Sequence, residues 1–143
     1  MKATIQHGEG ASVLYLVDET KPEGEQPAVV ASFKIGAMKL ADLKRIPVGT
    51  RFRQVASLMG PCDNARVVAA VHTNAIEFTG DGIKPGPDGK PRTSWLYFPK
   101  ASLFAPEGDG ARPGFTIYEI DDYTKPDEPP KKIIAARYVF ATD

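Results

Sequence analysis

Hydrophobic residues in this chain fall in short runs that are separated by glycine, proline and acidic residues at fairly even spacing. This rhythm predicts a mostly β protein with a minor helical part, either a β-barrel or a β-sandwich. We expect strands at Met1–His7, Ser12–Asp18, Ala28–Ile35, Val48–Leu58, Arg66–Val71, Ala75–Phe78, Ser94–Pro99, Phe115–Ile120 and Ile133–Thr142. The first two runs flank a glycine-rich turn, so they are expected to form a hairpin.

One segment has a helical rather than a strand-like period. Met38, Leu40, Leu43 and Ile46 are spaced by two, three and three residues, and a proline follows directly. Proline disfavours helical backbone in the residue before it. The pattern predicts one or two helical turns near Lys39–Arg45, which would serve as a short connector.

The order of features from Ile46 to Phe104 is similar to that of a small SH3-like barrel. A basic strand is followed by a turn at Gly60–Asn64, a Val-rich strand, a kink at Thr73-Asn74, a long Gly/Pro-rich tip at Gly80–Pro91 and an aromatic strand. The resemblance lies in strand order alone. It implies a central barrel that N- and C-terminal strands extend or cover, with the first and last strands adjacent because both must close one sheet system.

Polar segments rich in glycine, proline and acids are expected to be loops. They include Lys21–Pro27, Ala105–Gly114 and Asp121–Pro130. Turn-forming residues dominate all three, because glycine adopts positive φ angles and proline restricts its own φ angle.

Length and composition indicate one soluble domain covering residues 1–143. The chain is 42% hydrophobic and 25% charged, which is ordinary for a globular protein. It carries no apolar run that would serve as a secretory signal or a membrane span, and Cys62 is its only cysteine. We therefore expect a cytoplasmic protein with no membrane association and no internal disulfide.

Acidic and basic residues are segregated along the chain. From Lys34 to Lys100 there are 11 Lys/Arg and 5 Asp/Glu, whereas the flanks hold the other 7 basic and 13 acidic residues. The net charge of zero therefore conceals a basic centre, residues 34–104, between acidic flanks at 1–33 and 105–143. A cationic segment attracts phosphates or acidic partners.

Two strands of the centre carry candidate binding residues. Alternation puts Phe52 toward the core and Arg51 and Arg53 on the opposite face, where guanidinium groups can contact carboxylate or phosphate oxygens. In the aromatic strand, Leu96 and Phe98 share one face, and Trp95 and Tyr97 share the other. Exposed aromatic rings beside cations can stack on bases or hold peptide side chains. The candidate binding residues are Arg51, Arg53, Arg66, Trp95, Tyr97 and Lys100.

A simpler interpretation is that the candidate binding residues have only structural or solvent-exposed roles, which is the usual case for such residues. Large aromatic residues are mostly structural, so Trp95 and Tyr97 would pack beneath the flanking strands. The basic residues would form a solvated surface or pair with acidic loops of the same chain.

Signatures of catalysis are missing from the sequence. No phosphate-binding glycine loop, nucleophile elbow or metal-ligand spacing such as CxxC or HExxH occurs, so no metal or cofactor is expected. Cys62 and His72 remain a weak nucleophile–base pair.

The working hypothesis is a non-enzymatic protein that binds an anionic partner through its basic and aromatic residues. That partner is a nucleic acid, a nucleotide-like ligand or an acidic protein surface. The alternative is a structural or protein-interaction module that acts through its sheet edges or as a homo-oligomer.

Overall fold

The computed structural model describes residues 1–8, 11–20, 28–107, 112–121 and 126–142, and it confirms a mostly β protein. The loop expected at Lys21–Pro27 lies outside these ranges. The elements are β1 (Lys2–Gly8), β2 (Ala11–Asp18), β3 (Ala28–Lys34), η1 (Leu40–Arg45), β4 (Arg51–Ser57), β5 (Gly60–Val71), β6 (Ala75–Gly80), β7 (Ser94–Tyr97), η2 (Ala101–Leu103), β8 (Phe104–Glu107), β9 (Gly114–Asp121) and β10 (Lys131–Phe140).

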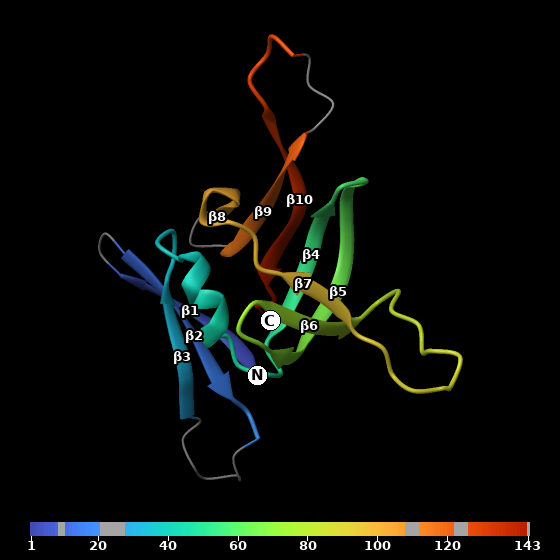
Figure 1. Cartoon of the computed structure of the whole chain (residues 1–143). Helices are drawn as coiled ribbons and strands as arrows, with labels where there is room; N and C mark the ends of the chain where they lie inside the picture. The colour runs from blue at the N-terminus through green and yellow to red at the C-terminus, as the bar shows by residue number, and fades with distance from the viewer. Residues whose placement is uncertain (9–10, 21–27, 108–111, 122–125, 143) are drawn as a thin grey trace.

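The strands form two sheets (Figure 1). A seven-stranded sheet in the order β7-β6-β5-β4-β10-β9-β8 curls into a half-barrel, and all of its pairs are antiparallel. The C-terminal strands extend the central ones through the pairing of β10 with β4. The segment that was expected to form a central barrel, residues 46–104, contributes strands β4 to β7 to this half-barrel.

The N-terminal strands form a separate three-stranded sheet, β1-β2-β3. The expected adjacency of the first and last strands is therefore wrong, because β10 pairs with β4 and β9. The expected helical connector is present as the 3-10 helix η1 between the two sheets. It contacts the small sheet through Arg45, whose guanidinium donates to the carbonyl of Ser32 at 3.1 Å and lies over the Phe33 ring at 5.0 Å.

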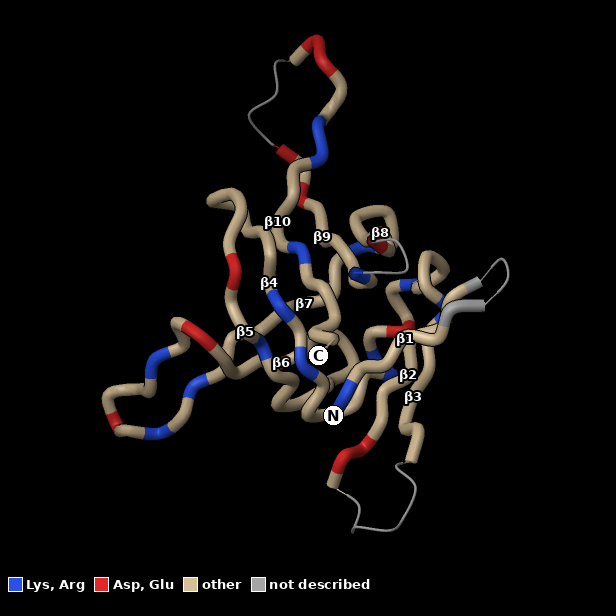
Figure 2. The backbone as a smooth tube through the Cα atoms, turned by 180° about the vertical axis from the view of Figure 1, so that it is seen from behind, with Lys and Arg blue, Asp and Glu red and all other residues tan. Residues whose placement is uncertain are grey.

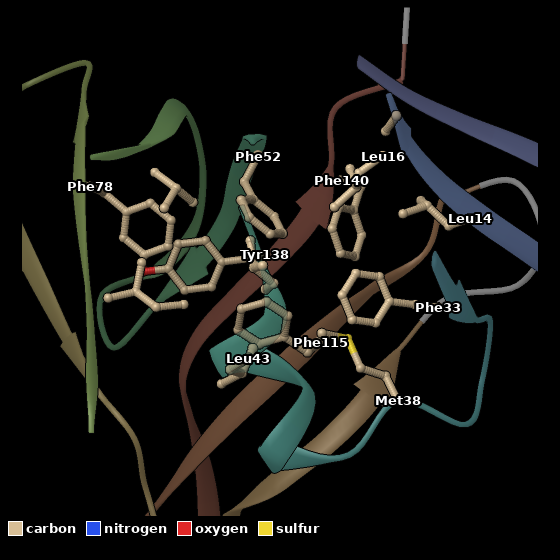
Figure 3. Packing of buried hydrophobic residues seen from close by; sticks show 14 of the residues in the cluster. Leu14, Leu16, Phe33, Met38, Leu43, Phe52, Phe78, Phe115, Tyr138 and Phe140 are labelled. Atoms are coloured by element: carbon tan, nitrogen blue, oxygen red, sulfur yellow. The ribbon is translucent and has the colours of Figure 1, made fainter. Parts of the chain in front are cut away.

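The core lies between the two sheets and is rich in aromatic residues (Figure 3). Phe52 is at its centre, with its ring centroid 4.6 Å from that of Phe140 and 6.0 Å from that of Phe78. Phe140 in turn stacks on Phe33 of the small sheet at 6.2 Å. Leu43 of η1 is fully buried in the same cluster. This packing joins both sheets and η1 in one core.

The turn expected at Gly60–Asn64 is wrong, because these residues already belong to β5. The register pairs Ala56 with Pro61 and Gln54 with Asn64 across β4 and β5. Pairing of β5 with β6 begins only at Arg66. The missing N–H of Pro61 is therefore compatible with a strand that has no neighbour on that side.

The loop expected at Ala105–Gly114 is also partly wrong, since β8 covers its first residues and β9 begins at Gly114. None of the helices in the described ranges has the length and apolar character needed to cross a membrane.

Candidate functional site

The seven-stranded sheet has two chemically different faces. Its inner face carries Phe52, Phe78 and Phe115 and packs on the core. Residues that are directly opposite each other in an antiparallel pair lie on the same face, and successive residues of a strand alternate between faces. The outer face therefore carries Trp95 and Tyr97 of β7.

Three rings stack in a row on the outer face. Trp95 lies 4.8 Å from His72, with the ring planes 9° apart, and 5.9 Å from Tyr97, with the planes 22° apart. Trp95 is 46% exposed and Tyr97 is 65% exposed. We call His72, Trp95 and Tyr97 the aromatic platform. Because Trp95 contacts both other rings, Tyr97 is the ring with the most surface open to a ligand.

Glu77 fixes the platform from beneath. It is the register partner of Trp95 on β6, and its carboxylate oxygens are hydrogen-bonded to Nε2 of His72 and Oγ1 of Thr93, both at 2.7 Å. The hydrogen bond from His72 and then that from Thr93 lower the pKa of Glu77. Both oxygens are thus engaged, which holds the His72 ring against Trp95 before any ligand arrives.

The local sequence explains why His72 reaches the platform. His72 and Ala75 close the β5–β6 turn, with a hydrogen bond of 2.8 Å from the His72 amide to the Ala75 carbonyl, and Ala75 is the register partner of Tyr97. Ala75 on β6 is therefore flanked by His72 on one side and by Tyr97 of β7 on the other.

Arg51 and Arg53 lie on the same outer face as the platform. Their register partners on β5 are Val67 and Ala65, and Val67 is in turn opposite Thr79 on β6. Three strand steps separate β4 from β7, about 14 Å across the sheet at the usual spacing of about 4.8 Å. Arg51 is level with Thr79, which is two residues along β6 from the partner of Trp95 and four from that of Tyr97. At about 3.3 Å per residue along the strands, Arg51 therefore lies about 16–20 Å from the two rings. The predicted combination of arginines and aromatic rings on one face is therefore present, with small neutral side chains between the two groups.

Arg53 also borders a hollow of about 200 Å³, lined by Arg53, Arg112 and residues 139–142. Its Nε donates to Asp63 Oδ1 at 2.5 Å, and this hydrogen bond raises the pKa of Arg53 and lowers that of Asp63. Arg53 is therefore paired with an acidic residue of the same chain, as the simpler interpretation predicts. Figure 2 shows one basic position of β10 close to the basic positions of β4 in the middle of the sheet.

Arg66, another predicted basic residue, does not lie on this face. Arg66 is the register partner of Phe52, so it leaves β5 on the inner face, where its Nη1 donates to the carbonyl oxygens of Ala65 at 3.0 Å and Asp81 at 2.6 Å. Lys100 is exposed and lies beyond β7, at the residue that precedes η2.

The interpretation that buried Trp95 and Tyr97 beneath flanking strands is wrong. The N-terminal strands pack on the inner face of the sheet, and β7 is an edge strand, so nothing in the described chain seals these two rings. His72, Glu77 and Arg112 were not among the residues predicted from the sequence. The outward position of Glu77 beside the aromatic strand was a usable signal for the first two.

The weak nucleophile–base pair is contradicted by the geometry. Cys62 and His72 lie at opposite ends of β5, about 33 Å apart at the usual rise of about 3.3 Å per residue. Cys62 Sγ instead contacts the carbonyl oxygen of Gln54 at 3.4 Å. Among the described residues, no group of three or more His, Cys, Asp or Glu side chains is arranged to hold a metal ion.

No known protein family, curated protein or solved structure matches this chain.

Proposed function

We propose that this protein is a non-enzymatic binding module for single-stranded nucleic acid. The observation that carries the proposal is the exposed, preorganised aromatic platform on the same sheet face as Arg51 and Arg53. An anionic strand with flat bases is the ligand class that uses both features. Of the partners that the sequence left open, an acidic protein surface would use the arginines and leave the stacked rings without a role.

Stacking supplies the first part of the recognition. Each base stacked on an aromatic side chain contributes about 1–3 kcal/mol to binding, largely independent of sequence. His72, Trp95 and Tyr97 already form a row of rings, and a base on the open side of Tyr97 continues it. Because Glu77 and Trp95 hold their neighbours in place, little side-chain entropy is lost on binding.

Phosphate contacts supply the second part. The separation of about 16–20 Å between the platform and Arg51 corresponds to a few nucleotides of an extended strand, since consecutive backbone phosphates are several ångströms apart. Guanidinium groups bind phosphate oxygens with two hydrogen bonds each. Few cations take part and the chain has no net charge, so binding should be of modest strength and clearly salt-dependent.

The test is fluorescence anisotropy of labelled oligothymidylate and oligouridylate with the full chain. We expect saturable binding that weakens several-fold between about 50 and about 200 mM salt, because neutralised phosphates release counterions. Tyr97→Ala should weaken binding about 5- to 150-fold, the size of one lost base stack. Tyr97→Phe is the matched control, since it keeps the ring, and should bind like the wild type.

Double-stranded DNA of the same length is the second comparison, because its bases are not available for stacking on Tyr97. Comparing oligothymidylate with oligouridylate shows whether the protein prefers single-stranded DNA or single-stranded RNA. No binding of any single strand at the lower salt concentration, or equal binding by Tyr97→Ala and the wild type, would overturn the proposal.

A second candidate function is association of two copies of the chain through a sheet edge. The small sheet supports it with an exposed apolar edge strand. Val29 and Val30 on the edge strand β3 are 57% and 50% exposed. An apolar edge strand can pair with a second copy of the chain. Light scattering tests this: a dimer that Val29→Lys converts to a monomer would support it, and a wild-type monomer would exclude it.

A further inference from the structure

A hollow lies beside the platform, around the end of β7. Its volume is about 270 Å³, and it is lined by Leu40, Ala41, Lys44, Thr73, Asn74 and Phe98. Ligand sites usually have volumes of about 300–1,000 Å³, so this groove suits one small ring system. Neither the platform nor the arginines of β4 contribute to it.

The groove and the platform are formed by neighbouring residues of the same two segments, the β5–β6 turn and the end of β7. His72 of the platform directly precedes Thr73, and Tyr97 directly precedes Phe98. Since successive strand residues alternate between faces, Tyr97 points to the outer face and Phe98 to the inner one. The two sites therefore lie on either side of the free edge of β7, one residue apart along the chain.

The walls of the groove are held in place by the fold. The Phe98 amide donates to the Asn74 carbonyl at 2.8 Å, which fixes the β5–β6 turn against the end of β7. On the other side, η1 is anchored by the fully buried Leu43. Residues three apart lie above each other on a 3-10 helix, so Ala41 and Lys44 present one side of η1 to the groove.

The chemistry of the lining is that of a nucleobase site. Phe98, Leu40 and Ala41 offer apolar surface to the faces of a flat ring, whereas Asn74 and Thr73 have donors and acceptors for its polar edge. The ammonium group of Lys44 can contact the phosphate attached to that nucleotide. Bases of single strands are commonly held in this way, splayed out of the strand, packed against rings and read at their edges.

We propose that this groove binds one nucleotide of the single strand, whose base leaves the stack at Tyr97 and passes around the edge of β7. The inference rests on the proposed function and deepens it, since the groove would give a largely sequence-independent platform a preference for one base. Asn74 is the residue that reads the base edge, and Lys44 binds its phosphate.

The test combines two measurements on the full chain. The first is anisotropy with homopolymeric oligonucleotides of the four bases. We expect Ala41→Phe, which fills the groove from an exposed position of η1, to weaken binding of the preferred base about tenfold, the size of one lost ring contact. Asn74→Ala should reduce the differences among the four bases, and Lys44→Gln should reduce the salt dependence. Lys131→Gln, on the far end of β10, is the charge-matched control and should behave like the wild type.

The second measurement is amide chemical-shift mapping with the free mononucleotides AMP, GMP, CMP and UMP. One of them should shift Thr73, Asn74 and Phe98 in the wild type and not in Ala41→Phe. This result does not depend on the platform, so it tests the groove even if the oligonucleotides do not bind.

The outcomes separate the two proposals. Loss of binding in Tyr97→Ala but not in Ala41→Phe would overturn the nucleotide groove and leave the proposed function intact. Mononucleotide shifts at the groove together with unchanged binding by Tyr97→Ala would support the groove and overturn the platform. Absence of mononucleotide shifts at Thr73, Asn74 and Phe98 would count decisively against the groove.

Discussion

Tyr138 makes the stability of this protein depend on pH in the alkaline range. Its side chain is 6% exposed on the inner face of β10, where its ring lies 5.2 Å from that of Phe78 and 5.3 Å from that of Phe115. Burial disfavours the phenolate and raises the pKa of Tyr138 from 10.0 to about 12, against a smaller opposite effect of Arg66.

The sign and size of the effect follow from linkage. The unfolded chain releases the Tyr138 proton near pH 10 and the folded chain only near pH 12, so rising pH favours the unfolded state. The full stabilisation is present below about pH 10. The loss of unfolding free energy is about 1.4 kcal/mol at about pH 11 and approaches about 2.7 kcal/mol above about pH 12.

Urea denaturation of the wild type and Tyr138→Phe at several pH values from about 7 to about 11.5 is the appropriate assay. The substitution removes the titrating hydroxyl and keeps the ring, so the two proteins should differ by about 1.4 kcal/mol more at about pH 11 than at neutral pH, in favour of the variant. Other tyrosines and lysines titrate in both proteins and cancel in this difference. Parallel pH profiles for the two proteins would refute the reasoning.

Three further predictions concern the core, a close backbone approach and the arginines. Phe52→Ala should lower the unfolding free energy by about 3–5 kcal/mol in urea denaturation, since this ring contacts four other aromatic rings; a loss below about 1 kcal/mol would contradict its central place in the core. Gly114→Ala should fail to fold or melt far below the wild type by circular dichroism, because an added Cβ would overlap the carbonyl oxygen of Tyr138, and an unchanged melting temperature would disprove this contact. Asp63→Asn removes the partner of Arg53 and should strengthen oligonucleotide binding several-fold at low salt; unchanged anisotropy titrations would show that Arg53 does not contact the ligand.

Local patterns in the sequence were sufficient for most elements and for the direction of side chains within one strand. The alternation of Ser94–Pro99 correctly placed Leu96 toward the core and Tyr97 away from it, because side-chain direction in a strand has a period of two. Pro47 correctly marked the end of η1.

Features that depend on pairing between distant strands were not accessible from these patterns. Gly60–Asn64 contains turn-forming residues, but pairing with β4 makes it a strand. The pairing of Arg66 with Phe52 puts Arg66 on the inner face, and register shifts between Gln54 and Ala56 and between Val68 and Ala70 change which residues further along these strands are opposite each other. His72 joins the platform only through the β5–β6–β7 register.

The intrinsic fluorescence of Trp95 is the most direct measurement of base stacking at the platform, because Trp95 is the only tryptophan of the chain and lies in the row of rings. We predict that unlabelled oligothymidylate quenches this fluorescence in a saturable way, that added salt moves the midpoint to higher concentration, and that Tyr97→Ala weakens the effect. Fluorescence that stays constant up to millimolar nucleotide at low salt would contradict a nucleic-acid site at these rings.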